Sequence, residues 1–213
     1  NMSSKIYPIG IQNFEKIRKE GYFYIDKTAL IYKLVKTGSY YFLSRPRRFG
    51  KSLLVSTLDA YFRGKKDLFQ GLAMERLEKE WNVYPVLHLD FSMTKYTALS
   101  DLLGQLNLNL YDWEKLYGKE EVEGTPAERF RGVIRRAYEQ TGKPVVVLID
   151  EYDAPLLDSN HLPELQNELR EEMRKFFSPL KAQGEYLRFL FLTGISKFSQ
   201  MSIFSELNNL QNI

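Results

Sequence analysis

The stretch that decides the fold reads Tyr40-Tyr41-Phe42-Leu43-Ser44-Arg45-Pro46-Arg47-Arg48-Phe49-Gly50-Lys51-Ser52-Leu53-Leu54. An aromatic and apolar run stops at a turn that contains several arginines and a proline. Gly-Lys-Ser then opens a segment with apolar residues at helical spacing. A strand, an anion-binding turn and a helix start, in this order, are typical of a phosphate-binding loop. The alternative is an ordinary strand-to-helix turn whose arginines are solvated.

In a phosphate-binding loop, the backbone N–H groups and the positive end of the helix macrodipole solvate the phosphates. Lys51 is predicted to reach the β- and γ-phosphates of a nucleotide, and the Ser52 hydroxyl to ligate Mg²⁺. The remaining predicted nucleotide contacts come from the same stretch: Arg47, Arg48, Phe49, Gly50 and Leu53.

One position departs from the pattern G-x-x-x-x-G-K-[ST], because Arg45 stands where the first glycine is expected. Glycine permits positive φ, whereas arginine favours negative φ, and Pro46 restricts the residue before it and lacks an N–H. The guanidinium groups of Arg47 and Arg48 can compensate with charge-assisted bonds to phosphate. In an empty site, one of them can instead pair with a carboxylate at position 150, 151 or 153. We expect this pairing without nucleotide and the phosphate contacts with it.

A second motif is the hydrophobic run Val145-Val146-Val147-Leu148-Ile149, which ends in Asp150-Glu151. This is the Walker B arrangement, in which an acidic residue at a strand tip holds Mg²⁺ and its water shell beside the phosphate loop. Asp150 is predicted to share the metal with Ser52, and Glu151 to polarise the attacking water. Strand-end solubility alone explains many such pairs. Downstream of the Gly-Lys-Ser strand, however, the pair predicts a P-loop nucleotide-binding fold.

A third element is the strand candidate Leu187-Arg188-Phe189-Leu190-Phe191-Leu192, which ends in Thr193 and Gly194. In P-loop ATPases with a strand inserted between the P-loop strand and the Walker B strand, a polar residue ends the inserted strand. Thr193 is therefore the candidate sensor of the γ-phosphate, and Ser196 is a weaker one. The alternative is a threonine that only caps the following turn.

Composition limits the classes of protein to consider. The 213 residues are 44% hydrophobic and 27% charged, which is typical of one large domain or one domain with a small appendage. No run of ~18 or more apolar residues predicts a membrane span, and the first residues lack the apolar core of a signal peptide. The absence of cysteine excludes disulfides, a thiolate nucleophile and Cys-ligated zinc. These features together favour a cytoplasmic location, and a net charge of +3 is too small to indicate nucleic acid.

Strands and helices are predicted to alternate along the chain. The strand candidates are 40–43, 85–91, 144–149 and 186–192, with 22–25 as a short strand or extended segment. The helix candidates are 11–20, 26–38, 53–64, 69–81, 99–117, 125–142 and 163–182, the last kinked or ended by Pro179. This alternation predicts a three-layer α/β P-loop NTPase fold with a mostly parallel sheet.

The end of the chain shows no further strand pattern after residue 198, so the fold is expected to be truncated before its last strand. Residues 1–38 are predicted to form a helical and aromatic extension packed on the core, and residues 39–213 a C-terminally incomplete P-loop ATPase domain. Without a fifth strand, Tyr40–Leu43 is expected at or near an exposed sheet edge, unless the N-terminal aromatic segment or another chain covers it. Such an edge can promote self-association.

With these motifs in view, the chain resembles the bacterial AAA-ATPase-like family, whose longer members often carry a C-terminal PD-(D/E)XK nuclease-like module. The resemblance covers nearly the whole chain and rests on residues 24–28, 45–52, 148–153, 193–199 and 204–210. Arg45 in place of glycine is typical of that family. The resemblance implies binding of ATP with Mg²⁺, and the nuclease-like module is not expected within this chain.

Three functions follow as hypotheses. The leading one is an ATP-binding P-loop domain that hydrolyses ATP slowly with Mg²⁺ and acts as a switch for an attached effector module or protein partner. The alternative is a non-hydrolysing nucleotide-binding or protein-interaction module whose loop is occupied by its own arginines. The third, direct nucleic-acid binding, rests only on the arginine-rich turn and the family's nuclease association.

Other residues are weaker candidates. Tyr22, Phe23 and Tyr24 can wall an adenine pocket, but core packing is the favoured interpretation. Asp26 is expected to cap a helix and to touch the nucleotide side. Four further side chains are better explained as ordinary core or surface residues than as metal ligands or an arginine finger: His88, His161, Arg170 and Arg174.

Overall fold

The computed structural model describes residues 13–44, 51–195, 203–204, 207 and 209–213. Its centre is a sheet of five parallel strands in the order β2-β3-β4-β1-β5. The strands are β1 (Tyr40–Ser44), β2 (Val86–Asp90), β3 (Val145–Asp150), β4 (Leu187–Gly194) and β5 (Gln211–Asn212). The predicted α/β class with a mostly parallel sheet is confirmed, and every strand pair is parallel.

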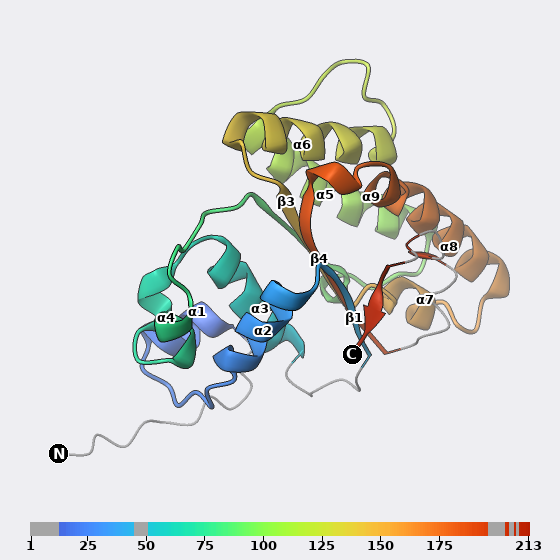
Figure 1. Cartoon of the computed structure of the whole chain (residues 1–213). Coiled ribbons are helices and arrows are strands. Elements are labelled where there is room, and N and C mark those ends of the chain that lie inside the picture. Colours follow the sequence, from blue (N-terminus) through green and yellow to red (C-terminus); the bar gives the residue numbers. More distant parts are fainter. Residues whose placement is uncertain (1–12, 45–50, 196–202, 205–206, 208) are drawn as a thin grey trace.

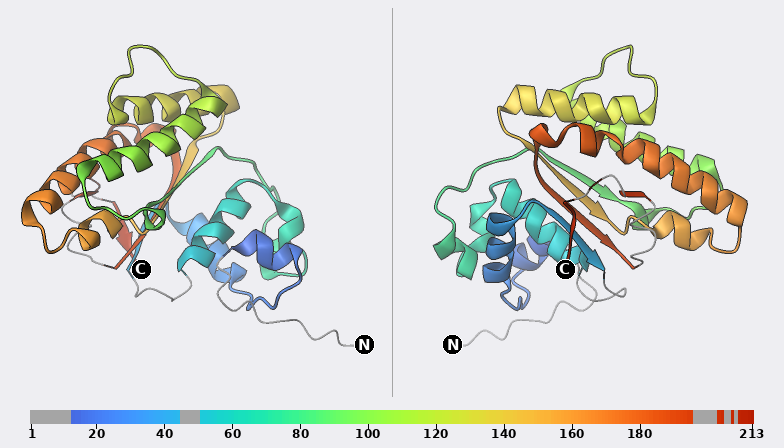
Figure 2. Two further views of the ribbon diagram at one scale, coloured as in Figure 1. Left: turned by 180° about the vertical axis from the view of Figure 1, so that it is seen from behind. Right: turned by 45° about the vertical axis from the view of Figure 1, so that its right-hand side comes forward.

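Helices cover both faces of this sheet, which makes three layers (Figures 1 and 2). One face carries α1 (Phe14–Lys19), α2 (Thr28–Thr37), α3 (Lys51–Phe62) and α4 (Ala73–Leu77). The other carries α5 (Leu99–Tyr117), α6 (Pro126–Thr141), α7 (Ala154–Asp158), α8 (Pro163–Phe177) and α9 (Pro179–Ala182). The short 3-10 turns are η1 (Lys66–Phe69), η2 (Phe91–Met93) and η3 (Gly184–Tyr186).

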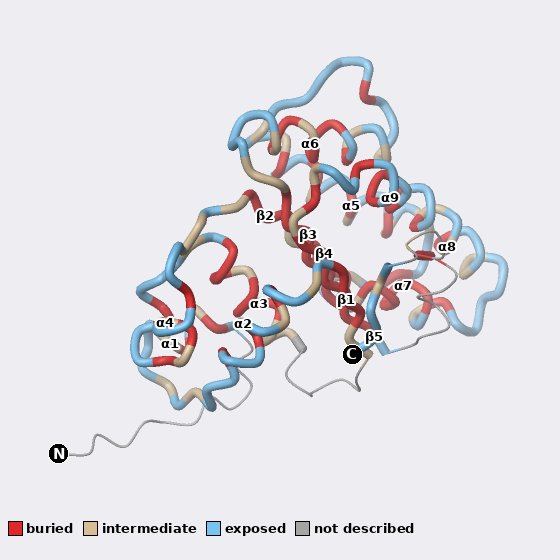
Figure 3. Tube along the Cα trace, in the orientation of Figure 1, coloured by how far each residue is buried: buried red, intermediate tan, exposed pale blue. Residues whose placement is uncertain are grey.

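The side chains of β3 show how the sheet divides its core. All six residues of the strand are buried, as its continuous β-branched run predicts. Val145, Val147 and Ile149 pack with α5 to α9, whereas Val146 and Leu148 pack with α1 to α4. Because successive strand residues point to opposite faces, the even-numbered positions of β3 face the P-loop helix α3. Figure 3 shows the buried strands between the two helical layers.

Several helix boundaries follow from the caps that the sequence contains. The Thr125 hydroxyl accepts a hydrogen bond from the Glu128 N–H at 3.2 Å, and Pro126 begins α6. Gly142 ends the same helix in the left-handed conformation, at φ +68°. Pro179 separates α8 from α9, as its position in the chain predicts.

The helix predicted over 69–81 is wrong in extent. These residues do not form one helix, because Gly71 adopts φ +81° and separates η1 from the short α4. Residues 22–25 form no strand, so of the two predicted alternatives only the extended segment remains, between α1 and α2. The sequence did not predict the short helix α7. It begins at Ala154, shortly after the Asp150-Glu151 pair.

The prediction that no fifth strand follows is wrong, so β1 is next to the edge of the sheet and is not the edge strand itself. Gln211 and Asn212 form β5 and pair with Tyr41 and Phe42, and the Ile213 N–H donates to the Phe42 carbonyl at 2.9 Å. A two-residue polar strand leaves no periodic signal in the sequence, so only the tertiary pairing reveals it. The order β4-β1-β5 agrees with the expected P-loop arrangement. Because β5 already pairs with Tyr41 and Phe42, these two residues are not open for the self-association that the sequence predicted.

The first helices pack on the P-loop helix. The Phe14 N–H donates to the Ser56 hydroxyl at 2.9 Å, and Phe14 lies in the same apolar cluster as Val55 and Leu58 of α3. The division of the chain into an extension, 1–38, and an ATPase domain, 39–213, stays a prediction. Within the described residues, no helix is long and apolar enough to cross a membrane.

Candidate functional site

The candidate site centres on Asp150, the last residue of β3. Its even position turns the side chain toward α3, and only 4% of its surface is exposed. The Thr193 hydroxyl donates a hydrogen bond to Asp150 Oδ1 at 2.6 Å. The Ser52 side chain, on the first turn of α3, lies close enough to this carboxylate to act toward a lower pKa. Three residues chosen from three separate motifs therefore meet at one place.

Thr193 is held from two sides. It is fully buried near the end of β4, and the same alternation that places Phe189 and Phe191 against α3 turns Thr193 toward that helix. Besides donating to Asp150, its hydroxyl accepts the Glu151 N–H at 3.0 Å. Its carbonyl accepts the Tyr152 N–H at 3.0 Å. Thr193 thus joins the tips of β3 and β4 and does more than cap a turn.

The chain bends sharply after Asp150. Glu151 adopts φ +49°, a conformation that non-glycine residues rarely take and that often marks functional sites. Asp153 accepts the Ile195 N–H at 2.8 Å. A Cβ on Gly194 would collide with the Tyr152 ring, so only glycine allows β4 to pass this turn. The turn that follows Asp150 is therefore fastened to the end of β4.

The electrostatics of Asp150 are unusual for a carboxylate. Burial raises its pKa, and the nearby Asp90 acts in the same direction, while the hydrogen bond from Thr193 and the Ser52 side chain oppose them without cancelling the rise. Among the side chains that the structure describes, no lysine, arginine or histidine forms an ion pair with Asp150. A buried carboxylate with hydroxyl partners and no cation is suited to receive a cation.

Sequence reasoning missed Asp90. It ends β2, and its register partner in β3 is Asp150. The strand was predicted over 85–91, and its single acidic residue lies at the tip. This position is the signal that could have placed it at the site, because the carboxyl ends of parallel strands meet at one edge of a sheet.

The predicted contacts at Arg47, Arg48, Phe49 and Gly50, the departure at Arg45 and the weaker sensor Ser196 all lie outside the described residues. Lys51 begins α3, and only its backbone belongs to the described part of the structure. Leu53, on the first turn of α3, is partly buried, and its carbonyl accepts the Thr57 hydroxyl at 2.7 Å. The predicted pairing of a loop arginine with a strand-tip carboxylate stays a prediction.

In the aromatic segment before α2, Tyr24 packs against the core, whereas the Phe23 side chain is exposed. The Tyr24 ring lies 5.3 Å from the Phe14 ring. Asp26 accepts the Thr28 N–H at 2.9 Å and the Ala73 N–H at 2.8 Å, so it joins the starts of α2 and α4. Asp26 thus accepts the first N–H of α2 from one residue before the N-cap position, which Lys27 occupies, and its contact with the nucleotide side stays a prediction.

The remaining candidates have ordinary partners. His88 Nδ1 lies 3.2 Å from Asp59 Oδ2, and His161 is exposed far along the chain. In the described ranges, no three histidine or acidic side chains form a group that could hold a metal. Arg174 pairs with Glu171 at 3.0 Å on the solvated side of α8, which agrees with a charged helix face.

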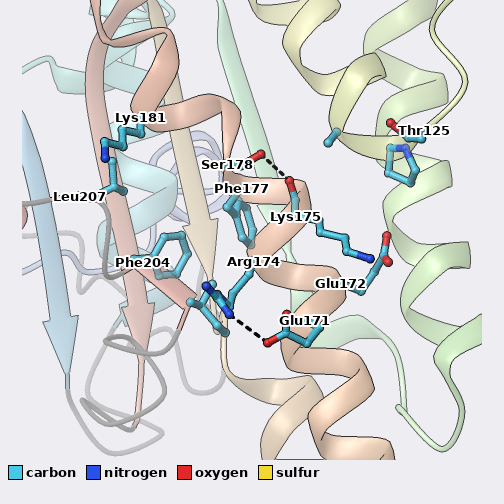
Figure 4. A pocket seen from close by; sticks show the side chains of 13 residues that line it. Thr125, Glu171, Glu172, Arg174, Lys175, Phe177, Ser178, Lys181, Phe204 and Leu207 are labelled. Carbon is cyan, nitrogen blue, oxygen red and sulfur yellow. Dashed lines mark hydrogen bonds and ion pairs between the residues drawn. The ribbon is translucent and has the colours of Figure 1, made fainter.

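A cavity of about 660 Å³ lies elsewhere, between the start of α6, the end of α8 and the segment containing Ile203 and Phe204 (Figure 4). It belongs to the face of the sheet opposite α3, so it is not the predicted phosphate site. Phe204 links the two places: its ring lies 5.6 Å from Tyr152, the residue after Glu151, and 5.0 Å from Phe177 in the cavity wall.

Comparison with known proteins agrees with this geometry. The model of the family described as predicted AAA-ATPase matches residues 8–204. A relative from Azotobacter chroococcum mcd 1, described as an uncharacterized protein in the vnfD 5' region, is 42% identical over 213 residues. The match takes in 100% of this chain but only 41% of the relative. The chain thus spans about two-fifths of the length of the curated relative that it matches.

Proposed function

The chain belongs to the predicted AAA-ATPase family, and from this premise we propose that it binds ATP with Mg²⁺ where β1, β3 and β4 meet the start of α3. One observation carries the proposal. The carboxylate of Asp150 is buried beside the hydroxyls of Ser52 and Thr193, and none of the described cationic side chains forms an ion pair with it.

The donor set fits magnesium. Mg²⁺ prefers oxygen ligands and usually binds through one or two protein groups together with water and substrate phosphates. The Asp150 carboxylate and the Ser52 hydroxyl supply such oxygens on facing elements, β3 and α3. When bound, the ion would neutralise charge on the β- and γ-phosphates during their separation.

The other residues take roles around this pair. Lys51 would contact the β- and γ-phosphates from the first residue of α3, where the helix dipole also favours anions. Thr193 would respond to the γ-phosphate, because its hydroxyl already bridges Asp150 and the Glu151 N–H. A carboxylate at the strand tips would polarise the attacking water, and Glu151 is the candidate that the sequence pattern indicates.

We propose slow hydrolysis and a switching role for an attached effector. Catalysis in P-loop sites is mostly positioning and electrostatics, so turnover is slow where no partner supplies an arginine. The switching role is supported by the contact between Tyr152 and Phe204, because it connects the strand-tip turn to a cavity on the far face. The relative's additional length leaves room for such a module in a longer protein.

Isothermal titration tests the binding step. ATP is titrated into the parent protein with Mg²⁺ and again with EDTA, and then into Lys51→Ala and Asp150→Asn. We expect the parent to bind more tightly with Mg²⁺, Lys51→Ala to lose at least about tenfold in affinity, and Asp150→Asn to lose the Mg²⁺ dependence. Asp112→Asn serves as control, because Asp112 is an exposed residue on α5.

A turnover assay then separates the two nucleotide hypotheses. Phosphate release that follows ATP binding supports the switch with hydrolysis. Binding without phosphate release from the parent favours a non-hydrolysing nucleotide-binding module. No binding at millimolar ATP contradicts the proposed ATP site and favours a protein-interaction module whose loop is occupied by its own arginines.

A further inference from the structure

Two neighbouring strands of the sheet end in aspartates at the same level. Asp90 of β2 and Asp150 of β3 are direct register partners, and adjacent strands lie ~4.8 Å apart. Both occupy positions that face α3. Val86, four residues before Asp90 and therefore on the same face of β2, packs in the apolar cluster that contains α3. Leu87 and Leu89 pack on the opposite face. The site therefore contains a second strand-tip carboxylate on the face of the phosphate loop.

The Asp90 carboxylate is held in one orientation and leaves one oxygen available. Its Oδ1 accepts both the N–H and the hydroxyl of Ser92, at 2.9 Å and 2.6 Å. Its Oδ2 has no hydrogen-bond donor among the described residues, and the side chain is only partly buried. An oriented carboxylate oxygen that is open to solvent can accept a hydrogen bond from water without rearranging.

Glu151 is less well placed than Asp90 to accept a hydrogen bond from a water molecule on the α3 face. Alternation along β3 would send its side chain to the face opposite Asp150, and the chain leaves the strand at this residue with φ +49°. Its N–H is already bonded to Thr193. These features place the backbone of Glu151 in the joint between β3 and β4, whereas Asp90 retains the strand geometry that directs its side chain toward α3.

We propose that Asp90 orients the attacking water and takes its proton when ATP is hydrolysed, which rests on the proposed ATP site. The water oxygen forms a bond to the γ-phosphorus while the bond between that phosphorus and the bridging oxygen breaks. ADP leaves with the bonding electron pair, and the water proton passes to the Asp90 carboxylate and then to solvent. Ser92 is the positioning residue that fixes this carboxylate.

The test compares Asp90→Asn with Glu151→Gln, with Asp112→Asn as control. Asparagine keeps an oxygen for Ser92, so the fold is retained, and melting of the unliganded variants checks this. For Asp90→Asn we expect ATP affinity within about threefold of the parent and a turnover at least ~100-fold lower, in the range attributed to a general base. We expect Glu151→Gln to retain more turnover than Asp90→Asn.

A second readout does not depend on turnover. Titration with ADP, Mg²⁺ and aluminium fluoride, which imitates the transferring phosphoryl group with its water in line, should show weaker binding for Asp90→Asn and unchanged binding for Asp112→Asn. Ser92→Ala should lower turnover to a smaller extent, and Ser92→Thr should restore it, because the hydroxyl returns.

Each outcome bears on one claim. Turnover of Asp90→Asn equal to that of the parent, with loss in Glu151→Gln, overturns the proposal and assigns the role to Glu151. A parent that binds ATP without hydrolysing it also overturns the proposal but leaves the ATP site standing. A parent that does not bind ATP contradicts the ATP site itself.

Discussion

Two buried carboxylates of this protein have opposite surroundings. Glu123, in the connection between α5 and α6, accepts two hydrogen bonds from Arg136, at 2.8 and 3.0 Å. Asp150, at the tip of β3, has the hydroxyls of Thr193 and Ser52 as partners and a second carboxylate, Asp90, beside it. The first carboxylate forms an ion pair with an arginine, and the second forms no ion pair with any described side chain.

The pKa values express the same difference. Burial acts to raise the pKa of Glu123, but the hydrogen bonds and charge of Arg136 outweigh it and hold the pKa below the usual glutamate range. Burial raises the pKa of Asp150, and its hydrogen bonds do not reverse the rise. A buried charge without a counter-charge is unfavourable for folding. The carboxylate of Asp150 at a strand tip therefore indicates a functional role, whereas the carboxylate of Glu123, paired with Arg136, indicates a structural one.

The largest expected effect comes from breaking the paired carboxylate. Arg136→Ala leaves Glu123 buried without its partner and also removes the bond from Arg136 to the Gly118 carbonyl. We expect the free energy of unfolding to fall by about 3–5 kcal/mol in chemical denaturation. Arg174→Ala, which breaks the exposed pair with Glu171, should change it by less than about 1 kcal/mol. Equal losses in the two variants would contradict the assignment.

The next effect comes from crowding the same pair. A Cβ added to Gly132 would collide with the Glu123 carboxylate and approach Arg136 Nη1 at 2.8 Å. We expect Gly132→Ala to destabilise the fold by about 1–3 kcal/mol, although alanine is the better helix former. Gly104→Ala in α5, where nothing lies within 4 Å, should be neutral or slightly stabilising.

Substitution of the strand-tip carboxylate of Asp150 should change the free energy of unfolding in the opposite direction. Asp150→Asn removes a buried charge that no described cation balances, so we expect the unliganded protein to gain about 1 kcal/mol of stability. The same variant should lose Mg²⁺-dependent ATP binding. Loss of unliganded stability comparable to that of Arg136→Ala would show that Asp150 is a structural residue.

The smallest expected effect is on the pH dependence of folding stability. Because the folded-state pKa of Glu123 is depressed, its stabilising contribution is present above the unfolded-state value of ~4.3 and is lost as the pH falls through the folded-state pKa. Glu123→Gln should therefore flatten the acid side of the stability curve below about pH 4.5, with little change in its slope between pH 5 and 7. A change of slope near neutrality would contradict this assignment.

Sequence patterns were sufficient for much of the fold. The continuous run 145–149 and the caps Thr125 and Gly142 are local signals, and the structure follows them. The strand β5 was not predictable, because two polar residues form it only by pairing with Tyr41 and Phe42. The helix expected over 69–81 was too long, because the backbone at Gly71 departs from helical conformation.

The site was predictable where a motif is contiguous in sequence. Ser52, Asp150 and Thr193 were each chosen from a strand end or helix start, and the structure brings them together. Asp90 was missed because its role depends on the register between β2 and β3, which no single stretch encodes. The left-handed backbone of Glu151 was also beyond the pattern, because nothing in its side chain requires it.

The central claim is that Asp150, which forms no ion pair with any described side chain, receives the metal of a nucleotide. Thermal melting of the parent and Asp150→Asn, each with and without ATP and Mg²⁺, tests it most directly. A ligand at 100 times its Kd stabilises the folded state by ~2.7 kcal/mol, so the parent should show a clear upward shift in Tm. Asp150→Asn should melt higher than the unliganded parent and show no shift with ATP and Mg²⁺. Equal shifts in both proteins, or none in the parent, would contradict the claim.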